Sequence, residues 1–80
     1  MEIELITPDQ KAFSGEAVSV ILPGINGYFE ILENHAPLVG ALREGTVRIR
    51  TKTGEHQIGI QSGVVEVLNN KVSLLADSLT

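Results

Sequence analysis

The stretch TVRIRTKTGEHQIGIQ, residues 46–61, decides the fold class of this chain. In its first half apolar and polar side chains alternate, so that Val47 and Ile49 face one way and two arginines face the other. A period of two residues indicates a half-buried β-strand. Residues 52–55 contain a glycine and predict a tight turn, because glycine tolerates positive φ, and residues 56–61 resume the strand pattern. The stretch therefore predicts a β-hairpin.

The same patterns recur along the rest of the chain. They predict further strands over residues 2–6, 16–22, 28–32, 64–68 and 72–76. Glycine, proline and asparagine separate these strands at intervals of about 8–12 residues, and one of the separators, Asn69-Asn70, predicts a second tight turn. No convincing amphipathic helix is found. We expect an all-β fold, a single antiparallel β-sandwich or flattened barrel of about 8–10 short strands, forming one domain over residues 1–80.

Composition excludes several classes of function. The chain has 80 residues, 42% of them hydrophobic, and no cysteine, so we expect a globular domain without disulfides or thiolate-bound zinc. A net charge of −4 and an aromatic content of 4% argue against nucleic acid as a partner. No apolar run approaches the ~20 residues of a membrane span, and the acidic first residues do not resemble a signal peptide, so we expect a soluble protein.

Residues that could carry catalysis are present but lie in no motif that would activate them. The two histidines are His35 and His56, and the five serines are Ser14, Ser19, Ser62, Ser73 and Ser78. Glu33-Asn34-His35 is the one local cluster of potential metal ligands, and we interpret it as a polar loop. Residues 23–27 lack the Lys-Ser/Thr pair and the helix of a phosphate-binding loop, and we interpret them as a wide turn. We expect no catalytic residue, no metal and no cofactor.

Three segments are apolar on both faces, over residues 18–22, 64–68 and 72–76. Because the outer face of a sandwich is normally polar, some of their apolar side chains would point partly outward. These are Ile21, Val64, Leu68 and Leu75. Two interpretations stay open: a bulge, a loop or curling of the sheet covers them, or they form an exposed strip that docks on another protein. Docking would also stabilise a domain this small.

Four of the six basic residues fall between positions 43 and 52. Alternation sends Arg48 and Arg50 to solvent, so we interpret the group as the solvated face of a strand. The alternative is a docking patch for an acidic partner.

The segment LPGINGYFEILENHAPL, residues 22–38, resembles the signature of the epsilon subunits of F-type ATP synthases, which are called delta in mitochondria. Residues 42–49 (LREGTVRI) and 62–77 (SGVVEVLNNKVSLLAD) are similar to two further motifs of that family. The resemblance runs from about residue 3 to residue 77, nearly the whole chain. Some positions depart from the family pattern: Tyr28 replaces an acidic residue, Glu30 a glycine, Glu33-Asn34 a Pro-Gly pair and Ser62 a glycine.

The resemblance implies a non-catalytic rotor subunit in the central stalk of a proton-translocating ATP synthase. Such a subunit binds the gamma subunit and the ring of c subunits and couples ion flow to ATP synthesis. It would lie at the cytoplasmic face of the bacterial inner membrane, held there through the complex without direct lipid insertion. Family members commonly continue into two C-terminal helices that inhibit ATP hydrolysis, and nothing in these 80 residues corresponds to them. We therefore expect helix-mediated inhibition to be absent.

By matching positions, the resemblance also implies which residues make the two contacts. The ring contact is expected in the loop 23–35, at Tyr28, Glu30 and His35. The gamma contact is expected on the outward apolar residues, at Ile21, Val64, Leu68 and Leu75. The alternative function is that of a β-module that binds a small ligand, with residues 23–37 as its lid.

Overall fold

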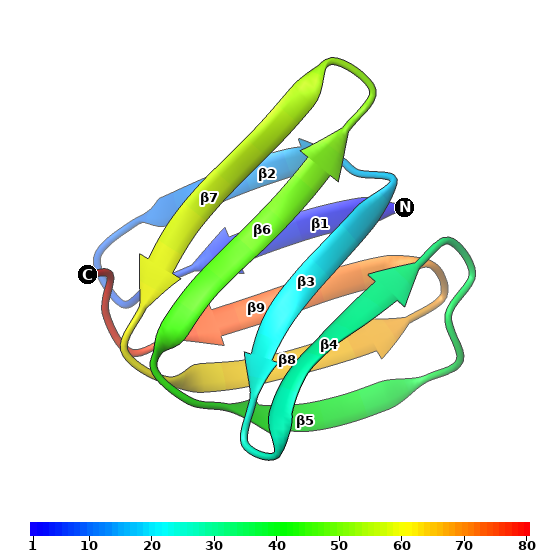
Figure 1. Ribbon diagram of the computed structural model, residues 1–80. Helices are drawn as coiled ribbons and strands as arrows, with labels where there is room; N and C mark the ends of the chain where they lie inside the picture. The colour runs from blue at the N-terminus through cyan, green and yellow to red at the C-terminus, as the bar shows by residue number, and fades with distance from the viewer.

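Nine β-strands and no helix make up the protein in the computed structural model, which describes residues 1–80 (Figure 1). The strands are β1 (Glu2–Ile6), β2 (Lys11–Glu16), β3 (Ser19–Gly24), β4 (Gly27–Leu32), β5 (Leu38–Leu42), β6 (Gly45–Thr51), β7 (Gly54–Ile60), β8 (Gly63–Leu68) and β9 (Lys71–Ala76). They form one sheet in the order β2-β1-β9-β8-β5-β3-β6-β7, and β4 pairs with β3. The expected all-β sandwich is confirmed.

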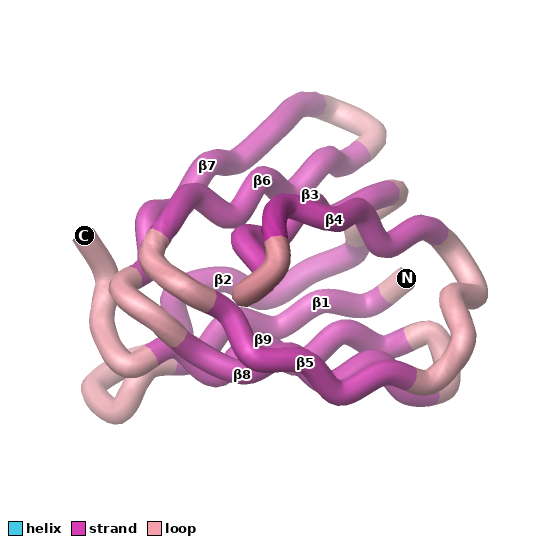
Figure 2. The backbone as a smooth tube through the Cα atoms, turned by 60° about the horizontal axis from the view of Figure 1, so that its bottom comes forward, coloured by secondary structure: helices cyan, strands magenta, loops and turns pink.

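The sheet folds over on itself between β5 and β3, where a single residue pair, Gly24 and Leu42, is in register. This corner divides the strands into two layers (Figures 1 and 2). We call the layer formed by β2, β1, β9, β8 and β5 the β9 layer, and the layer formed by β4, β3, β6 and β7 the β6 layer. Each layer has one inner face, toward the other layer, and one outer face.

The core lies between the two layers. Val47 and Ile49 of β6 are fully buried, as the alternation in that strand predicts. Burying each such aliphatic side chain stabilises the fold by about 1.5–3 kcal/mol. Sixteen buried apolar residues make up the core: Met1, Ile3, Leu5, Ala17, Val20, Leu22, Ile31, Leu42, Val47, Ile49, Ile60, Val65, Val67, Val72, Leu74 and Ala76.

One strand pair departs from the expected antiparallel arrangement. β1 and β9 run parallel, with Ile3 opposite Val72 and Leu5 opposite Leu74. All other strand pairs are antiparallel. The first and last strands of the chain therefore lie side by side in the middle of the β9 layer.

The chain turns between β3 and β4 more tightly than the sequence predicts. Gly24 and Gly27 are paired, so only Ile25 and Asn26 form the turn, and the wide turn predicted for residues 23–27 is wrong. Two glycines make this geometry accessible. Gly27 has a φ of 128°, and a Cβ on Gly24 would lie 2.8 Å from the Gly27 carbonyl oxygen.

The two predicted tight turns are confirmed. Thr51 pairs with Gly54 at the end of the β6–β7 hairpin, and Leu68 pairs with Lys71 at the end of the β8–β9 hairpin. In the second turn Asn69 and Asn70 have φ values of 50° and 60°. Asparagine is one of the few residues that adopt such values at low cost, which is why the pair terminates β8.

Candidate docking surfaces

Four apolar side chains form a row across the outer face of the β9 layer. Ile6 of β1 pairs with Leu75 of β9, Leu75 pairs with Val64 of β8, and Val64 pairs with Ala41 of β5. We call these four residues the apolar row. Val64 is 45% exposed and Leu75 57% exposed, so the prediction that both point outward is confirmed. Leu68, further along the same face of β8, is exposed as well.

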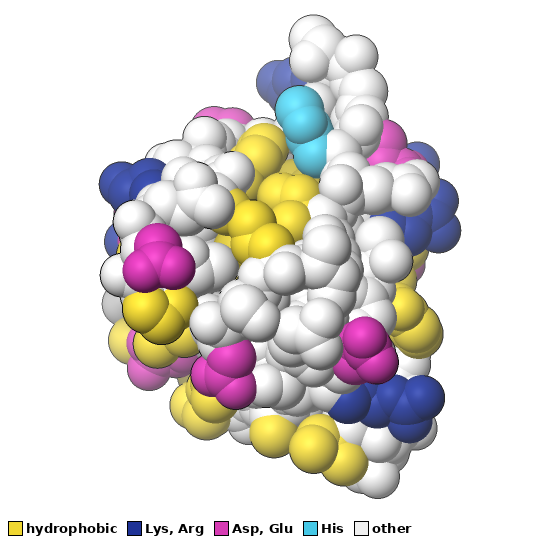
Figure 3. Space-filling model, turned by 90° about the vertical axis from the view of Figure 1, so that its left-hand side faces the viewer, with side chains coloured by type: hydrophobic (Ala, Val, Ile, Leu, Met, Phe, Trp, Pro, Cys, Tyr) yellow, Lys and Arg dark blue, Asp and Glu magenta, His cyan; other side chains and the backbone are white.

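A hollow of about 460 Å³ lies beside the apolar row. It is lined by Ile6, Thr7, Pro8, Ser62, Gly63, Val64, Leu75, Ala76 and Asp77. The Ser62 hydroxyl donates to a carboxylate oxygen of Asp77, leaving the second oxygen available to a further donor. Figure 3 views the sandwich from the end at which β1 and β9 finish and shows apolar side chains at the centre of that end, beside a histidine, and along the lower edge. This surface suits a partner segment that presents apolar side chains to the hollow and a hydrogen-bond donor to Asp77.

The neighbouring row on the same outer face is polar. Glu4, Ser73 and Glu66 stand opposite one another across β1, β9 and β8. Lys11 forms an ion pair with Glu4, with 3.0 Å between Nζ and Oε2. The apolar row is thus confined to the end of the layer where β1 and β9 finish.

Ile21 does not belong to this surface. It is half-buried on the outer face of the β6 layer, where it is paired with Glu30 and Arg48. The prediction that it points partly outward is confirmed, but the structure does not bring it together with Val64 and Leu75. The corner between β5 and β3 separates Ile21 from the apolar row. The periodicity of a single strand does not indicate which of the two layers that strand joins.

A second candidate surface follows β4. Tyr28, Glu30 and Leu32 alternate with the inward-facing Phe29 and Ile31, so all three lie on the outer face of the β6 layer. We call these three residues the β4 strip. The segment 23–35, described as a loop for the ring contact, therefore contains the strand predicted over residues 28–32, which begins one residue earlier and is paired to β3. Leu32, which is 55% exposed, was not among the contact residues predicted from the sequence. The alternation that places Tyr28 and Glu30 on one face of the strand places Leu32 there too.

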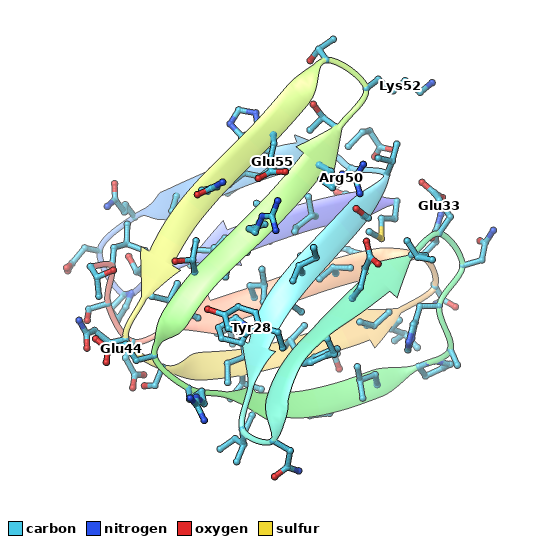
Figure 4. The ribbon with its side chains drawn as sticks, in the orientation of Figure 1. Tyr28, Glu33, Glu44, Arg50, Lys52 and Glu55 are labelled. Carbon is cyan, nitrogen blue, oxygen red and sulfur yellow. The ribbon has the colours of Figure 1, made fainter.

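Tyr28 leans across β3 onto the beginning of β6 (Figure 4). Its hydroxyl oxygen accepts a hydrogen bond from the Thr46 amide at 3.0 Å. The side chain fits because Gly45 has none: a Cβ there would lie 2.6 Å from the Tyr28 hydroxyl and 2.6 Å from the Cβ of Pro23. One edge of the ring is therefore fixed by the fold, and the rest is open to a partner.

His35 lies beyond the end of β4, in the loop that leads to β5. It is exposed, its backbone amide donates to the Leu32 carbonyl at 3.2 Å, and its Nδ1 lies 2.7 Å from the Ala36 carbonyl oxygen. Tyr28, Glu30 and His35 thus follow one another along β4 and its exit rather than forming one tight cluster.

Arg48 and Arg50 are exposed on the outer face of β6, which confirms the interpretation of this basic stretch as a solvated strand face. Arg48 donates two hydrogen bonds to Glu55 on the neighbouring β7, at 3.0 and 3.2 Å. These bonds, with a further one from Gln57, lower the pKa of Glu55. Figure 4 shows Arg50 and Glu55 at the same end of the two strands. The paired charges leave this face without a purely basic patch.

Acid is expected to destabilise the sandwich. Lys11 lowers the pKa of Glu4, the Met1 amino group lowers that of Glu33, and Arg48 lowers that of Glu55, in each case mainly through a hydrogen bond. Because these pKa values are depressed on folding, the carboxylates contribute stability above the unfolded value of 4.5 and lose it as pH falls through the folded values. Urea unfolding midpoints measured from pH 6 to about pH 2.5 should fall below about pH 4.5. Glu55→Gln should make that decline shallower, and an unchanged slope would contradict the role given to the Arg48–Glu55 pair.

No three histidine, aspartate or glutamate side chains stand close enough to hold a metal ion. His35 lies in the β4–β5 loop, whereas His56 of β7 packs on Phe13 of β2 with 5.0 Å between the ring centroids. The segment expected as a lid is held by pairing with β3 as far as Leu32, and the hollow of about 620 Å³ beside it has no charged residue in its lining. The chain has no helix of a length and apolarity suited to crossing a membrane.

Comparison with known proteins assigns this arrangement to a family. The sequence model described as "ATP synthase, Delta/Epsilon chain, beta-sandwich domain" matches residues 1–80, and the chain belongs to that family. It is 40% identical over 80 residues to the ATP synthase epsilon chain of Chlorobium limicola, covering 99% of this chain and 91% of the relative. With the epsilon chain of Chlorobaculum tepidum it shares 42% identity over 79 residues, covering 98% of this chain and 90% of the relative. The resemblance inferred from the sequence is confirmed.

Other relatives are longer. The epsilon chain of Helicobacter pylori strain P12 is 36% identical over 77 residues, and the match spans 96% of this chain and 63% of that one. The fold matches a chain in the central stalk and c-ring structure of the Tetrahymena thermophila mitochondrial ATP synthase, with a TM-score of 0.85 and 17% identity over 99% of this chain and 64% of the other. A chain of the Euglena gracilis mitochondrial ATP synthase gives a TM-score of 0.89 and 18% identity over 98% of this chain and 51% of the other. These structures share the sandwich fold.

Proposed function

We propose that the chain is a central-stalk subunit of a proton-translocating F-type ATP synthase. In this function it links the gamma subunit to the c-ring and rotates with them, so that ion flow is coupled to ATP synthesis. The family match over residues 1–80 carries the proposal. The protein makes and breaks no bonds itself, and it lies at the cytoplasmic face of a bacterial inner membrane, held there through the complex.

The apolar row is proposed as the gamma contact, together with Leu68. Its exposed leucine and valine side chains lose water on docking, at a gain of roughly 25 cal/mol per Å² of apolar area. Asp77, at the rim of the adjoining hollow, can accept a hydrogen bond from the partner and fix the register of docking. The polar row of Glu4, Ser73 and Glu66 marks where this contact ends.

The β4 strip and His35 are proposed as the c-ring contact. They are exposed, they follow one another along one strand and its exit loop, and the strand is fixed to β3 by pairing along its whole length. Such a rigid support suits a surface that transmits torque, because a loose loop would yield under load. The 80 residues contain no helix, and we propose that they supply no helix-mediated inhibition of ATP hydrolysis.

Co-expression with the gamma subunit from the same genome tests the proposal. With an affinity tag on gamma alone, the chain should co-purify in equal amount and remain bound through gel filtration. Deleting its gene should leave ATP synthesis uncoupled from proton flow in membrane vesicles. The proposed function is wrong if no complex forms and synthesis in the deletion strain stays coupled.

A further inference from the structure

An apolar groove lies on the side of the sandwich where each of the two layers ends. β4 is the last strand of the β6 layer, and β5 is the last strand of the β9 layer (Figures 1 and 2). The hollow of about 620 Å³ beside β4 lies between them, and we call it the β4–β5 groove. Its lining contains no charged residue and consists of Gly24, Ile25, Asn26, Gly27, Tyr28, Phe29, Leu38, Gly40 and Ala41.

The backbone of β4 has hydrogen-bonding groups without a partner along its free edge. Hydrogen-bonded pairs alternate along antiparallel strands, and the first pair flanks the two-residue turn between β3 and β4. Phe29 belongs to the second such pair, so the amide and carbonyl groups of Tyr28 and Glu30 point away from β3. The carbonyl of Leu32 points the same way, since it accepts a hydrogen bond from the His35 amide at 3.2 Å. A further strand can therefore pair with β4.

The edges on the other side of the sandwich are guarded against strand addition, as is usual in β-sheet proteins. The end of β7 is covered by residues 78–80, which pair with it. β2 carries the exposed Lys11 and Glu16, and its register with β1 is irregular. By contrast, β5 has no charged residue, and the one charged side chain of β4, that of Glu30, lies on the outer face and not in the groove. The β4–β5 groove is the open part of the sheet edge.

The groove has room for another backbone at Gly40. A Cβ at this position would meet only Val65 Cγ1, at 3.5 Å, so the fold itself does not require a glycine there. Glycine inside a strand often marks the close approach of another backbone. Phe29 and Leu38 line the same groove and are only partly buried against the core. A strand lying in the groove would cover both of these side chains.

We propose that the β4–β5 groove binds an extended, uncharged segment of the gamma subunit, which adds to β4 as a further strand. Free main-chain groups at a sheet edge bind extended peptides in this way, and the apolar lining selects apolar side chains. A charged side chain would lose its hydration in the groove without gaining a partner. Gamma is the partner because Ala41 lines the groove and also belongs to the apolar row, so that the two surfaces are continuous. The choice of gamma rests on the proposed function.

Amide exchange in the complex with purified gamma tests the added strand. The amides of Tyr28 and Glu30 should exchange at least roughly tenfold more slowly in the complex than in the free protein, because they become hydrogen-bonded. The Ser14 amide is the internal control. The Ala17 amide donates to the Met1 carbonyl, so alternation along β2 turns the Ser14 amide away from β1, onto the other free edge. Its exchange should be the same in both states.

Gly40→Val fills the groove and leaves the apolar row intact. The added side chain should weaken gamma binding by roughly tenfold or more, because it occupies the space of the incoming strand. Urea unfolding of the free variant should change little, since valine suits a strand and meets no close neighbour at this position. Ser73→Val is the matched control. It places the same side chain in the polar row, on the outer face of β9, and should leave gamma binding unchanged.

The possible results separate this proposal from the proposed function. If gamma binds but Tyr28 and Glu30 exchange as fast as in the free protein, or if Gly40→Val binds gamma normally, strand addition is wrong and the proposed function stands. If no complex with gamma forms, both are wrong. Protection of the two amides in the chain alone, increasing with protein concentration, would assign the groove to a second copy of the chain and overturn the choice of gamma.

Discussion

Alanine in place of Gly63 is expected to destabilise the sandwich by about 3 kcal/mol. The new Cβ would lie 2.4 Å from the Leu75 carbonyl oxygen, 3.1 Å from the Cα of Ala76 and 3.2 Å from the Leu75 carbonyl carbon. All three neighbours are backbone atoms of β9, so no side chain can rotate away. β8 and β9 must separate at their first pair, Gly63 with Ala76. Urea unfolding should show a lower midpoint with an unchanged slope.

Gly40→Ala is the matched control for this substitution. Gly40 lies in β5 on the other side of β8, and a Cβ there would meet only Val65 Cγ1, at the ordinary distance of 3.5 Å. Its expected effect is smaller than about 1 kcal/mol, since alanine also reduces the freedom of the unfolded chain. Equal losses in the two variants would mean that the short backbone approach at Gly63 is not the cause.

Glutamate in place of Leu75 is expected to weaken gamma binding by a factor of about one hundred or more, with little change in folding stability. Leu75, the one leucine of the apolar row, is 57% exposed, so a glutamate at this position is solvated in the free protein. In the complex the carboxylate would be buried without a partner, beside the carboxylate of Asp77, and such burial is costly. Titration calorimetry with purified gamma, alongside urea unfolding of the variant alone, measures both effects.

Leu32→Glu provides the comparison on the outer face of the other layer. Leu32 is 55% exposed and Leu75 57%, so the two substitutions replace equally exposed leucines with the same charged residue. Leu32→Glu should leave gamma binding unchanged. If it weakens gamma binding and Leu75→Glu does not, the gamma contact lies on the β6 layer with Ile21, and the assignment of the two surfaces is reversed.

Alternation along each strand predicted much of this structure. It placed Val47 and Ile49 in the core and sent Arg48 and Arg50 to solvent, because the side chains of a half-buried strand alternate strictly between two faces. It failed for β2, whose sequence KAFSGE follows no alternation, and for β5, whose sequence LVGAL is short and apolar. β2 is an edge strand, so it is formed by pairing with β1 more than by its own burial pattern.

The docking surfaces were predictable one strand at a time. The exposed positions of Val64, Leu68 and Leu75 follow from segments that are apolar on both faces. The assembly of Val64 and Leu75 into a row with Ile6 and Ala41 depends on register across four strands, which is a property of the whole sheet. For the same reason Ile21 could not be separated from them beforehand. The hydrogen bond between the Asn70 side-chain amide and Glu33 joins two loops, and no local pattern connects positions so distant in the chain.

The parallel pairing of β1 with β9 has a consequence for how the protein is made. β1 can form its hairpin with β2 early, but its other edge stays open until residues 71–76 have been synthesised. The central pair of the β9 layer therefore cannot form while the nascent chain ends before β9 or while β9 is still inside the ribosome. Folds dominated by such distant pairings fold slowly, and their unpaired edges attract other chains. The sandwich can therefore be completed only after β9 has left the ribosome, and until then the free edge of β1 is open to pairing with other chains.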